Sequence, residues 1–145
     1  MDILGLKLFV TEAEVNDLAQ KHFPDGAVEN LRIRVTPEGV LVSGEYPALG
    51  LRVAFETLWE LSASGPELQA RLATVKVAGF SAGILKGALL KMARDAVGHE
   101  PGLRVQDESV AVNVEEAARA RGVPVRVRFT AVRCSIASLV LEAAG

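Results

Sequence analysis

The fold is decided by residues 51–64, LRVAFETLWELSAS, in which apolar and polar side chains alternate over 14 positions. A period of two indicates a β-strand with one apolar face, here carried by the odd-numbered residues from Leu51 to Ala63. Strands usually have about five or six residues. A strand this long therefore predicts a strongly twisted antiparallel sheet that wraps around whatever packs on its apolar face.

The residues that follow predict the partner strand. Gly65-Pro66 forms a two-residue turn, so the chain returns antiparallel to itself. In this register Trp59 faces Leu72 on the apolar side and Glu60 faces Arg71 on the polar side. The apolar phase slips after Leu72, which predicts a β-bulge near residues 73–74.

A second hairpin precedes the long strand. Residues 31–36 and 40–44 both alternate, and Thr36-Pro37-Glu38-Gly39 between them has the composition of a turn. Pairing Ile33 with Val42, and Val35 with Val40, keeps every apolar side chain on one face.

Three helices are expected. Thr11 and Glu14 form a capping box that begins a helix over residues 12–22. A longer helix is expected over 81–97, with Ser81 as N-cap, Gly98 after its end, and an apolar stripe. The stripe consists of Leu85, Leu89, Met92 and Ala96, widened by Ile84, Ala88 and Ala93. A short helix is expected over 115–121.

The remaining segments predict strands at 3–9, 103–105, 110–112, 125–131 and 136–141. The whole chain is then one α+β domain over residues 1–145. It is expected to hold one long, strongly twisted antiparallel sheet wrapped around a main helix, plus a shorter N-terminal helix. Its two halves, about 11–78 and 81–143, have a similar order of elements, which is typical either of an internal repeat or of unrelated amphipathic hairpins.

Composition narrows the classes of function. Half of the 145 residues are hydrophobic and the formal net charge is −2. Nucleic acid is not expected as a partner, because phosphate binding requires a basic surplus. The N-terminus shows no signal peptide and no stretch is long enough to span a bilayer, so a cytoplasmic location is expected. An envelope location is the alternative if a leader has been removed.

No catalytic pattern is found. His22 and His99 each lie at the end of a predicted helix, where the helix dipole favours imidazolium, and Cys134 is interpreted as a small apolar residue near the end of a strand. No spacing of His and Cys predicts a metal site, and no glycine motif predicts a phosphate loop. We therefore expect no enzyme activity, no metal and no cofactor.

Two further patterns have alternative readings. Gly79, Gly83 and Gly87 are spaced four apart, which favours close packing of the second helix on the sheet over a gap left for a ligand. The arginine pairs at 32/34 and 126/128 could contact an anionic membrane surface, but solvated outer faces paired with cross-strand glutamates are favoured.

The order of the predicted elements and the pattern of residues in several segments resemble those of a known family. The segments that carry the resemblance are "FVTEAEVNDLAQ", "LRIRVTPEGVLVSGEYPALGLRVAFETLWEL", "VKVAGF", "EPGLRVQDESVAVNV" and "PVRVRFTAVRC". Together they resemble bacterial lipid-binding proteins of the LmeA type and, more widely, the tubular lipid-binding (TULIP) superfamily. The resemblance covers about residues 5–143. It implies a bent sheet wrapped around a helix, with an apolar tube for acyl chains.

The leading hypothesis is a non-enzymatic protein that binds a lipid or another long apolar molecule. The first rival hypothesis is a structural or protein-interaction domain whose core is filled, and the second is an enzyme that uses the cavity for a small apolar substrate. The strands at 3–9 and 136–141 are nearly uncharged and are expected at sheet edges, which predicts a homodimer. The apolar lining is predicted to consist of Leu31, Ile33, Val42, Val53, Phe55, Trp59, Leu61, Leu72, Leu85, Leu89, Met92, Val127 and Phe129.

Overall fold

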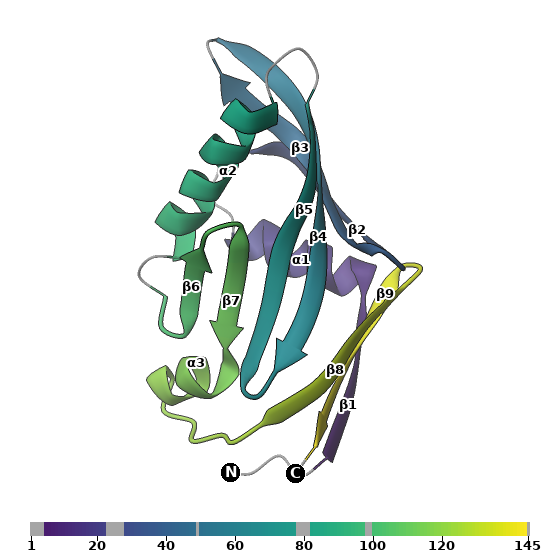
Figure 1. The fold of residues 1–145 in the computed structure, drawn as a ribbon, viewed down its shortest axis with the longest axis vertical. Coiled ribbons are helices and arrows are strands. Elements are labelled where there is room, and N and C mark those ends of the chain that lie inside the picture. The colour runs from purple at the N-terminus through teal and green to yellow at the C-terminus, as the bar shows by residue number, and fades with distance from the viewer. Residues whose placement is uncertain (1–4, 23–27, 49, 78–81, 98–99, 145) are drawn as a thin grey trace.

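The computed structural model describes residues 5–22, 28–48, 50–77, 82–97 and 100–144. This part of the chain is an α+β domain with antiparallel sheets, as predicted (Figure 1). Its elements are β1 (Gly5–Thr11), α1 (Glu12–His22), β2 (Glu29–Thr36), β3 (Gly39–Ala48), β4 (Leu51–Ser64), β5 (Glu67–Val77), α2 (Ala82–Val97), β6 (Leu103–Gln106), β7 (Ser109–Asn113), α3 (Val114–Ala120), β8 (Arg128–Ser135) and β9 (Ser138–Ala144).

The strands form two sheets, which corrects the expectation of a single one. The larger sheet has the order β2-β3-β4-β5-β7-β6, and the smaller sheet has the order β1-β9-β8. The smaller sheet joins the two ends of the chain, with Leu8 opposite Leu141. The last strand was expected at an edge, but β9 is the central strand of this sheet, because β1 pairs with one side of it and β8 with the other.

The register of the larger sheet agrees with the sequence patterns. Ile33 lies opposite Val42, and Trp59 lies opposite Leu72. The β4–β5 register shifts between Leu58 and Trp59, so that Ala73 on β5 has no direct partner. The predicted bulge is therefore confirmed, and it carries the apolar face of β5 from Leu72 across to Val75.

Helix α1 covers the free edge of β2 with side chains. The predicted capping box is present, since the Glu14 amide donates to Thr11 Oγ1 and Thr11 N donates to Glu14 Oε1, both at 3.2 Å. One turn further on, Asn16 exchanges two hydrogen bonds with the backbone of Ile33. Glu12 Oε1 accepts from the amide of Val35 at 2.8 Å. The edge of β2 is thus satisfied without a further strand.

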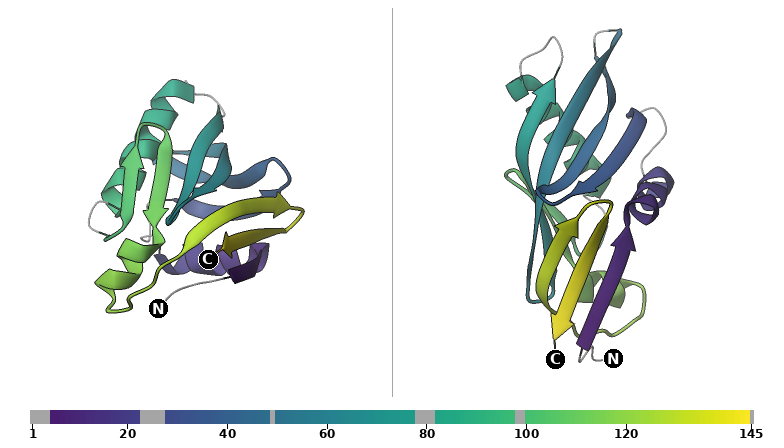
Figure 2. Two further views of the ribbon diagram at one scale, coloured as in Figure 1. Left: turned by 60° about the horizontal axis from the view of Figure 1, so that its bottom comes forward. Right: turned by 90° about the vertical axis from the view of Figure 1, so that its right-hand side faces the viewer.

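The smaller sheet packs against the lower part of β4, as the views in Figure 2 show. Val127, Phe129 and Ala143 form a buried cluster there, against which Ala63 and Leu68 of the larger sheet also pack. The amide of Phe129 donates to the carbonyl oxygen of Gly65 at 2.7 Å. This bond connects β8 to the β4–β5 turn and, with the buried cluster, helps to set how the two sheets pack.

The last two strands begin later than the sequence indicates. The strand expected from residue 125 begins at Arg128, and the strand expected from Ile136 begins at Ser138. Ile136 lies in the turn between them and is 82% exposed. Ala137 has a φ of 61°, so the turn falls where the apolar pattern alone suggests a continuing strand.

The shorter helices also differ in detail. Helix α3 begins at Val114, one residue before the expected start, because the side chain of Asn113 caps it by accepting from the Glu116 amide at 3.0 Å. Helix α2 packs beside β5 and β6. Among its described side chains the buried one is Leu90, which lies outside the predicted stripe, whereas Leu89 is half-buried.

Candidate functional site

An apolar groove of about 270 Å³ lies between the two sheets. Strands β4, β5, β6 and β7 form one wall and strands β8 and β9 form the other. Of the described lining residues Leu139 is buried and the rest are half-buried or exposed, so the groove is open to solvent. The lining consists of Leu61, Ser62, Leu68, Gln69, Ala70, Leu103, Val110, Val112, Val132, Leu139 and Leu141.

The floor of the groove follows from strand register. Ala70 lies directly between Leu61 on β4 and Val110 on β7. Leu68 and Leu103 both lie opposite Val112. Because alternate residues of a strand share a face, these residues all point to the same side of the larger sheet. The small side chain of Ala70 at the centre of this row leaves space above the floor.

The second wall comes from the smaller sheet. Val132 and Leu141 lie opposite one another, and on the other side of β9 Leu141 lies opposite Leu8. Leu8 is 45% exposed and Leu6 is 39% exposed, although both share the apolar face of this sheet. An apolar surface therefore continues from the groove onto β1.

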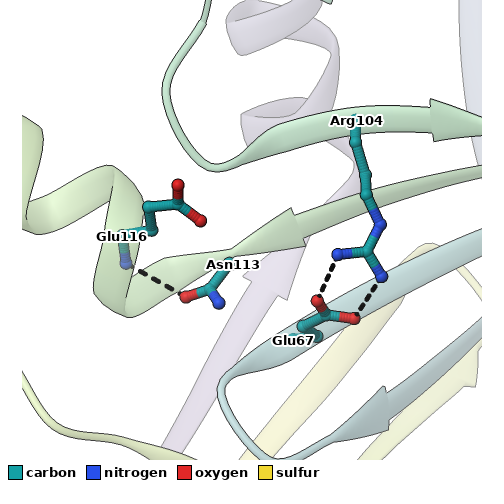
Figure 3. A network of polar contacts seen from close by, with 4 residues as sticks. All are labelled: Glu67, Arg104, Asn113 and Glu116. Carbon is teal, nitrogen blue, oxygen red and sulfur yellow. Dashed lines mark hydrogen bonds and ion pairs between the residues drawn. The ribbon is translucent and has the colours of Figure 1, made fainter.

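The charged side chains of the same strands occupy the opposite face. Glu67 and Arg104 are each adjacent in sequence to a groove residue, and they form a bidentate ion pair with N–O distances of 2.7 and 2.9 Å (Figure 3). Arg71 pairs with Glu60 at 2.8 Å on this face, as predicted. Among the described residues that line the groove, Ser62 and Gln69 are polar and none is charged.

The predicted lining residues are distributed over several parts of the fold. Leu61 lines the groove. Six others are buried in the core: Ile33, Val53, Phe55, Leu72, Val127 and Phe129. Leu31, Val42, Trp59 and Leu89 are half-buried and lie outside the groove lining. The side chains of Leu85 and Met92 lie outside what the structure describes.

Most of the groove residues are absent from the predicted lining. Leu68 and Ala70 are on the face that the β5 alternation predicts to be apolar, and Val110 and Val112 continue the same face. That pattern could have identified them. Val132, Leu139 and Leu141 could not be found in this way, because their role depends on the packing of one sheet against the other.

One buried polar side chain interrupts the apolar face of β4. Thr57 is 2% exposed, and its hydroxyl donates to the carbonyl oxygen of Val42 at 3.0 Å. The same hydroxyl accepts from Trp59 Nε1 at 2.9 Å. Each polar group therefore has a partner, which offsets the cost of burying it. The pair holds the indole of Trp59 in a fixed position two residues from the groove.

Arg32 and Arg34 lie on a solvated face, as favoured, but without the expected cross-strand glutamates, and Gly87 departs from the expected close packing. Arg32 lies opposite Ser43 and Arg34 opposite Leu41, so no cross-strand carboxylate faces either of them in register. Both arginines are exposed. Gly87 is exposed, and a Cβ added there would meet nothing within 4 Å, so close packing does not explain this glycine. The structures of Gly79, Ser81, Gly98 and His99 lie outside the described residues.

The described residues offer little reactive chemistry. Burial raises the pKa of the Cys134 thiol, which disfavours the nucleophilic thiolate. Within the described ranges, no cluster of three or more His, Cys, Asp or Glu residues is suited to a metal ion. No described helix combines the length and the apolar character needed to cross a membrane.

Comparison with models of protein families, with curated proteins and with solved structures found no match to this chain.

Proposed function

We propose that this protein binds a lipid or another long apolar molecule, without catalysis, in the groove between its two sheets. The observation that carries the proposal is the nearly uniform apolar lining of a groove that is open to solvent. An exposed apolar concavity is costly unless something covers it, and such sites commonly bind apolar ligands.

The size of the groove indicates how much of a ligand it holds. Its volume of about 270 Å³ lies just below the range of roughly 300–1,000 Å³ that is usual for ligand pockets. An apolar cavity of about 150 Å³ is enough for one benzene molecule. The groove therefore suits part of an alkyl chain, and the apolar surface of Leu6 and Leu8 lies where a longer chain would continue.

The energetics are compatible with useful affinity. Burial of each methylene group contributes about 0.8 kcal/mol, so six buried groups contribute about 5 kcal/mol. Association and ordering of the ligand oppose this gain. Binding by the groove alone is then weak, and contacts beyond it are needed for a tight complex.

The resemblance to tubular lipid-binding proteins forms part of this proposal. In that interpretation the long strands β3, β4 and β5 correspond to the bent sheet, and α2 corresponds to the helix it wraps. The proposed groove differs in one respect, since its second wall is formed by β8 and β9 rather than by a helix.

The test uses a variant that fills the groove. Ala70→Phe places a large side chain at the centre of the floor, whereas Ala54→Phe adds the same group to an exposed position on the opposite face of β4. Native mass spectrometry of the purified protein should show a co-purified apolar molecule in the unsubstituted chain and in Ala54→Phe, and none in Ala70→Phe.

Titration with dodecanoate provides the second measurement. Saturable binding is expected for the unsubstituted chain and Ala54→Phe, and a loss of about tenfold or more for Ala70→Phe, with thermal unfolding showing that each variant is folded. Absence of any co-purified ligand, together with no saturable binding of dodecanoate, would favour the rival hypothesis of a structural or protein-interaction domain.

A further inference from the structure

Strand β1 has an outer edge with which no described strand pairs. The other sheet edges are protected. The side chains of Asn16 and Glu12 form hydrogen bonds with the backbone at the edge of β2. Strand β6 is only four residues long and packs beside α2. Strand β8 forms a backbone hydrogen bond with Gly65. Short or covered edges are the usual protection against pairing with another chain. The edge of β1 has neither form of protection among the described residues.

The direction of the backbone groups on β1 can be derived from two hydrogen bonds. Glu12 N donates to the carbonyl oxygen of Ala137 at 2.9 Å, in the same register as the β1–β9 ladder. Thr11 N instead donates to Glu14 Oε1. Because hydrogen-bonded positions alternate along an antiparallel strand, even-numbered residues bond to β9. The N–H and C=O groups of Gly5, Lys7 and Phe9 therefore point away from the sheet.

The exposed side chains beside these groups are apolar. Phe9 is 61% exposed on one face, and Leu8 is 45% exposed on the other. Apolar residues on both faces of an unpaired edge favour association, because pairing covers both faces at once. The single charge on the strand is Lys7, which lies 4.0 Å from Glu142 of the neighbouring strand.

Symmetry and charge determine the register in which the outer edges of β1 from two copies of the chain can pair. Two antiparallel copies related by a twofold axis keep equivalent faces together, so the axis passes through a residue pair such as Lys7–Lys7 or Leu8–Leu8. The first places two like charges opposite each other, which is unfavourable. The second places each Lys7 opposite the Phe9 ring of the other copy, an arrangement that favours a cation beside an aromatic ring.

We propose that a second copy of this chain pairs with the outer edge of β1, antiparallel and centred on Leu8. The contact is small compared with the roughly 1,200 Å² of a stable interface, so the dimer has a dissociation constant in the micromolar range. This inference does not depend on what the groove binds.

The first test measures association. Sedimentation velocity of the full chain from about 1 to 100 μM should show a concentration-dependent dimer. Lys7→Pro removes an outward N–H without removing a bond to β9, and should raise the dissociation constant about tenfold or more. Lys7→Ala keeps that N–H and should keep the dimer. A monomer at every concentration, or an equal dimer in Lys7→Pro, would overturn the proposal.

The second test fixes the register. In a Cys134→Ser background, Leu8→Cys places two thiols at the twofold axis in a pair that is not hydrogen-bonded, where the Cα atoms are about 4.5 Å apart and a disulfide can form. Oxidation should give a covalent dimer for Leu8→Cys and none for Lys7→Cys or Phe9→Cys. Efficient crosslinking of Lys7→Cys instead, or of none of the three, would contradict pairing centred on Leu8.

Discussion

The side-chain amide of Asn16 pairs with the backbone of Ile33 as a neighbouring strand would. Its Nδ2 donates to the Ile33 carbonyl oxygen at 2.7 Å, and its Oδ1 accepts from the Ile33 amide at 2.9 Å. Ile33 is buried, so both of these backbone groups need a partner within the protein. A residue on α1 thus ends the larger sheet at β2.

Asn16→Ala is therefore expected to destabilise the fold. Two buried backbone groups lose their partner, which costs about 2–3 kcal/mol in the free energy of unfolding. Gln20→Ala, at an exposed position on the same helix, should change it by less than about 0.5 kcal/mol. Urea unfolding followed by circular dichroism measures both values. Equal stability of the two variants would show that the Asn16 contact is not needed.

Two glycines give opposite expectations for substitution by alanine. Gly39 has a φ of 145°, and a Cβ there would collide with the carbonyl oxygen of Trp59. Gly39→Ala should destabilise the protein by about 2 kcal/mol or more, because both strain and the collision oppose it. Gly87 is exposed within α2, so Gly87→Ala should stabilise by about 0.5–1 kcal/mol. Thermal unfolding of the pair tests both signs, and a stable Gly39→Ala protein would be the contrary result.

The sequence predicted the parts of the fold that depend on neighbouring residues. The hairpin registers, the bulge beside Ala73 and the capping box of α1 follow from local alternation and turn chemistry. Pairing of β1 with β9 did not follow, because it joins segments about as far apart as the chain allows, and nothing in either segment specifies its partner.

The groove was only partly predictable for the same reason. Leu61 and its neighbours on β5 share a face that the alternation indicates. The opposing wall depends on how the smaller sheet packs, which is set in part by the bond from Phe129 to Gly65. Ile136 shows where local pattern fails as a guide. Its apolar side chain predicts the start of a strand, but the positive φ of Ala137 places a turn there instead.

The thiol of Cys134 is expected to react slowly. Burial raises its pKa, so at neutral pH less thiolate is present than in a free cysteine. The rate of alkylation by iodoacetamide should rise with pH but reach half of its maximum at a higher pH than for an unstructured peptide thiol. Half-maximal alkylation at a lower pH than for that peptide would indicate an activated cysteine and would reopen the question of catalysis.

None of the candidate reactive side chains is expected to matter for binding. His22→Ala, His99→Ala and Cys134→Ala should fold and retain dodecanoate binding within about twofold, because no second group is positioned by the sequence to act with them. Isothermal titration of each variant measures the affinity. A large loss of function at unchanged stability in any of the three would point to a catalytic role.

Trp59 should report occupancy of the groove. Its Nε1 is fixed by the hydrogen bond to Thr57, and Leu61, two residues further along the same face, lines the groove at about 7 Å along the strand. A bound alkyl chain changes the surroundings of the indole without direct displacement. Saturable change in Trp59 emission is therefore expected with dodecanoate.

The length of the chain should decide the affinity. Each additional methylene that leaves water contributes about 0.8 kcal/mol, or about fourfold in the dissociation constant, until the groove and the adjoining surface of Leu6 and Leu8 are filled. Octanoate should therefore bind more weakly than dodecanoate, with a smaller further gain for hexadecanoate. Leu8→Ser should reduce the gain in affinity from dodecanoate to hexadecanoate, because the longer chain then extends over a polar side chain. Leu51→Ser, at an exposed leucine of the larger sheet, is the control. Emission of Trp59 that is indifferent to all three acids would contradict ligand binding in this groove.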